Sequence, residues 1–212
     1  MDFLAPLTNY KAGKLYEEVH THFIRDEYED AEKKAKRLLE AYPQHTKTLL
    51  LLAQISFNRH KYQRARERYN KILEYTADTE ARFGRAQSSF LLRKYEDALN
   101  DYLFLYETSF KAVTYLVKLG ETFHALWLEA VALRYYQKAV TLAPTSIEAH
   151  MGLAQHLVFL GRYTDARDHT AHAKNLYYQH KNQITADVLV SIETLDHKIE
   201  SHIKKKPTKK KA

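Results

Sequence analysis

Apolar residues recur at helical spacing along most of the 212-residue chain. In one stretch, Leu116, Leu119 and Phe123 are separated by three and four positions, which places them on one face of a helix. Shortly afterwards, Ala132 and Tyr136 repeat this spacing on a second helix. With only five Gly and four Pro residues, the chain offers little material for long turns. The pattern predicts an all-α chain of paired helices joined by short turns.

A short phrase with a central alanine recurs five times, at spacings of 34, 33, 34 and 34 residues. The alanines are Ala31, Ala65, Ala98, Ala132 and Ala166. A second small or slim residue stands twelve positions before each alanine, and these residues are Val19, Ala53, Ala86, Gly120 and Ala154. Small residues are needed where paired helices approach closely, because larger side chains would separate the helix axes. The two matched columns predict five stacked helical hairpins.

This pattern resembles the tetratricopeptide repeat (TPR) family. The stretch from Leu116 to Pro144 carries an apolar residue, Leu-Gly, an aromatic residue, Ala, an aromatic residue and Pro in the family's order. The resemblance implies a right-handed TPR superhelix, or α-solenoid, of about five helix-turn-helix repeats. We expect these repeats at residues 12–45, 46–78, 79–112, 113–146 and 147–180.

The flanks of the array are expected to close it. Residues 1–11 would form an N-terminal arm that either folds back over the first helix or binds a partner. Residues 181–204 would form an amphipathic capping helix, which seals the last repeat as a solenoid requires. Its apolar stripe comprises Ile184, Val188, Ile192, Leu195, Ile199 and Ile203.

In such arrays the first helix of each pair lines a concave groove, which we take as the candidate partner-binding site. Equivalent positions form a polar row of His20, Gln54, Gln87, Glu121 and Gln155. The flanking apolar positions are Tyr16, Phe23, Leu50, Phe57, Phe83, Phe90, Met151 and Phe159. The polar row could bind the backbone of a peptide or amphipathic helix while the apolar positions take its side chains. Alternatively, several of the aromatic residues, particularly Phe57 and Phe90, belong to the core between neighbouring helices.

One function known in the family is disfavoured. TPR co-chaperones that hold the acidic C-termini of heat-shock chaperones use a clamp of Lys and Asn, then Asn, then Lys and Arg across three repeats. The corresponding residues here are Tyr16 and His20, then Leu51, then Glu80 and Gly84, and a register one repeat later is no better. These side chains would not neutralise a carboxylate. The chain is therefore not expected to be a carboxylate-clamp co-chaperone.

The fourth hairpin tip is unusually apolar. Its sequence, ALWLEA at Ala125–Ala130, contains Trp127, the only tryptophan of the chain. An exposed Trp would suit a lateral contact with another protein, because Trp is enriched among the residues that dominate interfaces. The alternative is that Trp127 folds over the adjoining turn and stays covered. The sequence does not decide between them.

The positive charge is concentrated at the C-terminal end. The net charge is +7, and six lysines lie within residues 204–211, which leaves 7 − 6 = +1 for the rest. These lysines are Lys204, Lys205, Lys206, Lys209, Lys210 and Lys211. We expect residues 205–212 to form a disordered tail. It would either be a solvated end or attract nucleic acid, an anionic surface or the nuclear import machinery.

Metal, cofactor and catalytic chemistry are not expected. The chain has no Cys, so thiolate sites are excluded, and its twelve His residues form no complete ligand motif. Asp168, His169 and His172 share one helix but lack an evident fourth ligand. Phosphate-binding loops, nucleophile elbows and HExxH are absent from the sequence. We expect a protein without enzymatic activity.

No apolar run is long enough to span a bilayer, and the start MDFLAPLTNY does not resemble a secretory signal. A cytoplasmic location is therefore expected, with the lysine tail allowing a nuclear one. The favoured function is a scaffold or adaptor subunit that holds partner proteins. The alternatives are a cytosolic chaperone that shields an apolar client segment, and an adaptor tethered to nucleic acid or membrane by its tail.

Overall fold

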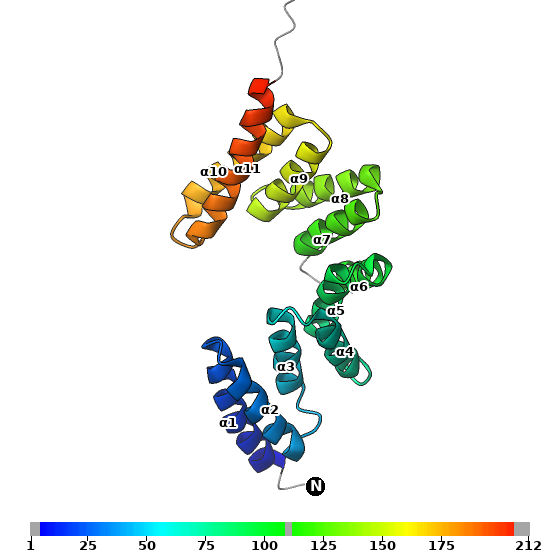
Figure 1. Cartoon of the computed structure of the whole chain (residues 1–212), viewed down its shortest axis with the longest axis vertical. Helices are drawn as coiled ribbons and strands as arrows, with labels where there is room; N and C mark the ends of the chain where they lie inside the picture. The colour runs from blue at the N-terminus through cyan, green and yellow to red at the C-terminus, as the bar shows by residue number, and fades with distance from the viewer. Residues whose placement is uncertain (1–4, 109–111, 206–212) are drawn as a thin grey trace, which may run out of the picture. The chain divides into compact units, whose positions relative to one another are not determined.

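The computed structural model describes residues 5–108 and 112–205, and all regular structure in these ranges is helical (Figure 1). The first six helices are α1 (Ala5–Ile24), α2 (Tyr28–Ala41), α3 (Thr46–Asn58), α4 (Tyr62–Leu73), α5 (Thr79–Leu91) and α6 (Tyr95–Thr108). The other five are α7 (Ala112–Ala125), α8 (Glu129–Leu142), α9 (Ile147–Phe159), α10 (Tyr163–His180) and α11 (Ala186–Lys205). The predicted all-α helical-repeat fold is confirmed for this part of the chain.

The chain divides into two compact units, residues 1–101 and 102–212, and the boundary lies within α6. In the first unit, α1 pairs with α2 and α3 pairs with α4, while α5 packs against α4. Its core forms around the small residues of the repeat, because Val19, Ala31, Ala53 and Ala65 are fully buried. Close helix approach also requires glycine at position 84, where a Cβ atom would lie 2.2 Å from Cζ of Tyr69.

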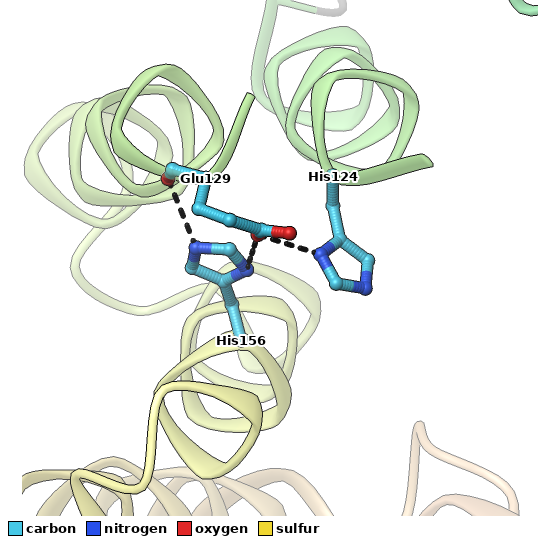
Figure 2. Close-up of side chains that lie close together, drawn as sticks. All are labelled: His124, Glu129 and His156. Atoms are coloured by element: carbon cyan, nitrogen blue, oxygen red, sulfur yellow. Dashed lines mark hydrogen bonds and ion pairs between the residues drawn. The ribbon is translucent and has the colours of Figure 1, made fainter. Parts of the chain in front are cut away.

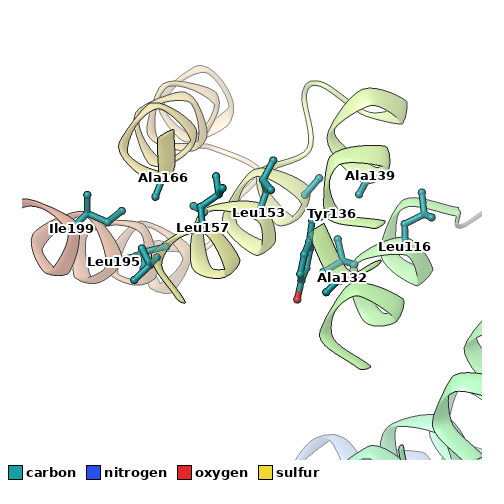
Figure 3. Packing of buried hydrophobic residues seen from close by; sticks show 13 residues of the cluster. Leu116, Ala132, Tyr136, Ala139, Leu153, Leu157, Ala166, Leu195 and Ile199 are labelled. Carbon is teal, nitrogen blue, oxygen red and sulfur yellow. The ribbon is translucent and has the colours of Figure 1, made fainter. Parts of the chain in front are cut away.

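In the second unit, α7 pairs with α8, α9 pairs with α10, and α11 packs against α10 with further contacts to α9. Figure 3 shows the main core of this unit, in which side chains from α7, α8, α9, α10 and α11 meet. Tyr136 lies at its centre between Gly120 and Gly152, where a Cβ atom would approach the ring to 2.8 and 3.0 Å. The ring therefore occupies space that the two glycines leave open. Its burial raises the pKa of Tyr136.

The five hairpin turns share one backbone conformation. In each turn one residue has a positive φ between 58° and 72°, and these residues are Asp26, His60, Arg93, Trp127 and Gly161. In the fourth turn, Trp127 N–H donates to the His124 carbonyl and Leu128 N–H donates to the Phe123 carbonyl, both at 2.9 Å. This is the hydrogen-bond pattern of a Schellman motif, in which glycine is the favoured left-handed residue. Only the fifth turn has glycine at this position.

The ends of the array differ in detail from the expected boundaries. Helix α1 begins at Ala5, so residues 5–11 of the expected arm belong to the first helix, and residues 1–4 lie outside the described part. At the other end, α11 runs from Ala186 to Lys205 and buries Ile192 and Ile199 completely. Ile184, Val188 and Ile203 of the same stripe are partly buried. The stripe thus faces the last hairpin and closes the core of the second unit.

Candidate functional site

In the first unit, polar groove candidates from α1, α3 and α5 are partly exposed, namely His20, Gln54 and Gln87. Gln54 Nε2 donates a hydrogen bond to Glu80 Oε1 at 2.6 Å, which links α3 to α5. The Gln54 amide therefore already has a hydrogen-bond partner within the protein. Burial raises the pKa of Tyr16, and the carboxylates of Glu17 and Glu80 add to this effect.

The aromatic candidates of the first unit take part in closing the hairpin turns. Phe23 packs against Tyr28, Phe57 against Tyr62 and Phe90 against Tyr95, with ring centroids 6.1, 5.4 and 5.4 Å apart, respectively. All three Phe rings are partly buried, as is Phe83. Leu50 is only 8% exposed and belongs to the core between α3, α4 and α5. Leu50 therefore has little surface to offer a partner, and the three paired Phe rings also have a packing role.

In the second unit, two candidates line a pocket with a volume of about 470 Å³. These are Met151 and Gln155 of α9. The apolar wall of the pocket is completed by Ile147, Leu176, Ile184 and Val188. The polar lining residues are Thr145, Glu148, His180, Asp187 and Ser191. The pocket is thus formed by α9, α10, α11 and the turns that precede α9 and α11.

The remaining two groove candidates of the second unit lie outside the lining of this pocket. Glu121 forms an ion pair with Lys118 at 2.9 Å. The Phe159 side chain is 52% exposed and packs edge-on against His124, with ring centroids 4.5 Å apart.

Sequence reasoning missed the contribution of the second helix and the cap to this pocket. It counted only the first helix of each pair, whereas Leu176 comes from α10 and Val188 from α11. The signal was present in part, because Ile184 and Val188 belong to the predicted capping stripe. That stripe predicts burial against the last repeat but does not predict that its first turn leaves a pocket open.

The other predicted contact sites have different surroundings. Trp127 is 78% exposed at the tip between α7 and α8, and the neighbouring Leu128 is 47% exposed. Lys204 is exposed, and for Lys205 only the backbone is described. The other tail lysines, Lys206, Lys209, Lys210 and Lys211, lie outside the described residues.

Two histidine clusters occur in the second unit. His169 lies beside His150 of α9, with the two Nδ1 atoms 3.0 Å apart, and the rings of His150 and His172 are 4.4 Å apart. Within residues 5–108 and 112–205, one group of three side chains places potential metal-ligand atoms within 4.8 Å of one another. It consists of His124, Glu129 and His156 (Figure 2).

Residues 25–104 match the family model described as anaphase-promoting complex, cyclosome, subunit 3. Among curated proteins no significant match is found.

Solved structures resemble most of the chain. PilF of Pseudomonas aeruginosa aligns with a TM-score of 0.68 and 17% identity, covering 92% of this chain and 90% of PilF. MamA of Desulfovibrio magneticus RS-1 aligns with a TM-score of 0.66 and 19% identity, covering 82% of this chain and 98% of the MamA chain. A tetratricopeptide repeat protein from Parabacteroides merdae has a TM-score of 0.67 and 20% identity, with 92% and 78% coverage. At these identities the similarity concerns the fold. Within the described residues, no helix combines the length and apolar character of a membrane span.

Proposed function

Because the chain has the tetratricopeptide repeat fold, we propose that it is a non-enzymatic scaffold or adaptor subunit. It holds a short segment of a partner protein in the pocket between α9, α10 and α11. The observation that carries this proposal is the pocket of about 470 Å³, which has an apolar wall and contains two of the groove residues, Met151 and Gln155. Pockets of this size, apolar with a few polar groups, are the usual form of ligand sites.

The wall of the pocket suits an apolar side chain of the partner. Met151, Leu176 and Val188 present aliphatic groups, and the flexible Met side chain can adjust to different shapes. Full burial of one Leu- or Phe-sized side chain contributes about 1.5–3 kcal/mol. Several contacts would be needed, since association also costs translational and side-chain entropy. The exposed amide of Gln155 would add a hydrogen bond to the backbone of the partner segment.

The charge around the pocket indicates which segments it would accept. Glu148 and Asp187 are both exposed and line the pocket, whereas no Lys or Arg is among the lining residues. A hydrogen bond from the Thr185 side chain lowers the pKa of Asp187, so this carboxyl is charged at neutral pH. The proposed partner segment therefore carries a Lys or Arg beside its apolar anchor, and an acidic tail would be repelled.

The family match supports a place in a larger assembly. The model that matches residues 25–104 is described as a subunit of a multi-protein complex. A scaffold that joins other subunits needs more than one contact surface. The match to a complex subunit therefore favours the scaffold or adaptor interpretation over a chaperone that only shields a client in its groove.

Trp127 is the second proposed contact. Its side chain is 78% exposed, and its φ of 61° is unfavourable for a bulky residue. Asp26, His60 and Arg93 share this conformation, so the exposure of a large apolar side chain is what distinguishes Trp127. We assign Trp127 to a lateral contact with another subunit, with Leu128 beside it.

The pocket can be tested with two valines on one helix. Val188 lines the pocket, while Val190 is 61% exposed and lies outside its lining. Partners would be captured by cross-linking and affinity purification with the full chain, and their retention compared between Val188→Glu and Val190→Glu. Asp187→Lys, compared with the exposed Asp168→Lys, tests the charge requirement without touching the core.

The proposal predicts that Val188→Glu and Asp187→Lys lose the main partner while Val190→Glu and Asp168→Lys retain it. Circular dichroism and urea unfolding would confirm that the compared variants are folded. Retention of the main partner by folded Val188→Glu and Asp187→Lys would exclude the pocket as the binding site.

A further inference from the structure

The fourth hairpin departs from the repeat pattern at two positions that contact each other. In the first three hairpins, a Phe at the end of the first helix packs against the Tyr that opens the second helix. The pairs are Phe23–Tyr28, Phe57–Tyr62 and Phe90–Tyr95. The corresponding residues of the fourth hairpin are His124 and Glu129. Two aromatic positions have therefore become a pair of metal-competent side chains.

A third departure occurs in the following repeat. The residue two positions after the small residue of the first helix is Ile55, Ser88 and Thr122 in the second, third and fourth repeats. In the fifth repeat this residue is His156, which α9 places against the α7–α8 turn (Figure 2). Three departures that lie in two different repeats thus converge on one place.

The geometry of the three side chains resembles that of a metal site. His124 Nδ1 lies 2.8 Å from Glu129 Oε2, and His156 Nδ1 lies 3.8 Å from the same oxygen. A tetrahedral ion with ligand bonds of about 2.0–2.1 Å places its ligand atoms about 3.3 Å apart. The two observed distances lie on either side of this value. Small side-chain rotations would therefore bring the three groups into ligand positions.

The ring orientation of His156 directs a nitrogen lone pair toward His124 and Glu129. Its side chain is 1% exposed, and its Nε2 lies 3.2 Å from the backbone carbonyl oxygen of Glu129. A carbonyl oxygen can only accept, so Nε2 carries the proton and Nδ1 is the free acceptor. A metal-binding His characteristically donates its other N–H to a carbonyl in this way.

Two buried atoms of the cluster have no hydrogen-bond partner, and these are His156 Nδ1 and Glu129 Oε1. Buried polar atoms are nearly always satisfied, because an unsatisfied one loses its hydration without compensation. A simple ion pair between His124 and Glu129 accounts for Oε2 but leaves both of these atoms without a partner. A cation placed between the three side chains would satisfy His156 Nδ1, and a carboxylate that binds it through both oxygens would also satisfy Glu129 Oε1.

We propose that His124, Glu129 and His156 bind a divalent transition-metal ion of the zinc class. The ligands would be Nδ1 of each imidazole and the carboxylate of Glu129, with a fourth position open to solvent. Two imidazoles and one carboxylate match zinc, whereas magnesium and calcium prefer ligand sets made of oxygen. The ion would join the α7–α8 turn to α9 and so hold the tip that carries Trp127.

The chain contains a natural comparison for the simpler explanation that His124 and Glu129 form only an ion pair. Across the α1–α2 turn, His22 Nδ1 lies 2.6 Å from Glu27 Oε2, with the same separation of five residues in sequence. Within the described ranges, no third His or acidic side chain completes that pair into a metal-competent group. The His22–Glu27 pair is therefore a two-group control within the same molecule.

The test uses the untagged full chain after treatment with a chelator. Zn²⁺ would be titrated by calorimetry, and Co²⁺ binding followed by visible absorption, whose intensity reports tetrahedral coordination. The key variant is His124→Phe/Glu129→Tyr, which restores the aromatic pair of the first three hairpins and should fold. Glu129→Gln removes one ligand charge with minimal change of shape. Controls are Glu27→Gln at the two-group pair and His169→Gln/His172→Gln at the other histidine cluster.

The proposal predicts one Zn²⁺ per chain for the wild type and an intense Co²⁺ spectrum. Glu129→Gln should weaken Zn²⁺ binding by about 100-fold, because it removes a charged ligand. Mutation of a residue that only hydrogen-bonds to a metal ligand already lowers metal affinity about 10–100-fold. The Phe/Tyr double variant should abolish the Co²⁺ spectrum, while both control variants keep it. Absence of stoichiometric binding by the wild type would overturn the proposal. So would binding that survives the Phe/Tyr variant or disappears in His169→Gln/His172→Gln.

Discussion

Replacing Trp127 with glycine is expected to make the chain more stable. Trp127 adopts a φ of 61°, and a left-handed backbone costs a non-glycine residue about 1–2 kcal/mol. The greater freedom of glycine in the unfolded chain offsets about 0.5–1 kcal/mol of this gain. The side chain is already 78% exposed, which is close to its exposure in a denatured ensemble, so little burial is lost. The net stabilisation should be about 0.5–1 kcal/mol.

Thermal and urea unfolding of the two proteins would measure this difference. For a chain of this size, the gain corresponds to an increase in Tm of about 1–4 °C. Arg93→Gly is the matched control, because Arg93 is exposed and has a φ of 60° in the preceding hairpin. Both variants should gain stability, but only Trp127→Gly should lose a lateral partner. Destabilisation by Trp127→Gly would show that packing of the indole outweighs the backbone strain and would refute this reasoning.

Two further predictions concern the packing of the repeats and their response to pH. Gly84→Ala should destabilise the first unit by about 1–3 kcal/mol in urea unfolding, because its Cβ would overlap the Tyr69 ring. Gly13→Ala, with no atom within 4 Å of the new Cβ, should instead stabilise α1 by about 0.5–1 kcal/mol. Burial lowers the pKa of both His150 and His169, and each also lies near His172. The unfolded chain then binds more protons than the folded one, so unfolding free energy should fall as pH drops through about 6.5. A His150→Gln/His169→Gln variant should show a smaller pH dependence of urea unfolding, and an unchanged slope would contradict this origin.

The groove residues show how far sequence reasoning reaches at a site. Counting along the repeat identified the equivalent positions, and two of them, Met151 and Gln155, line the pocket of the second unit. Counting does not tell how much of a side chain remains accessible. Leu50 occupies a groove position by number but lies in the core, because α4 and α5 pack over it. Accessibility depends on the neighbours of a residue, and these come from other helices.

The sequence by itself determined the repeat length, the helical hairpins and the small residues at their contacts. These features follow from local spacing and from volume, since a helix period and a close approach each leave a pattern in the chain. The positions of unusual residues, such as Trp127 at a hairpin tip, were also set by this period.

Only the tertiary structure decided which distant side chains meet. It brings Val188 of the cap beside Met151, and it places His156 of one repeat against His124 and Glu129 of the preceding one. Such meetings depend on how successive hairpins pack and on where a buried ring directs its nitrogen atoms. Neither property follows from the spacing of residues along a single helix, so the pocket and the candidate metal site emerged only when the helices were assembled.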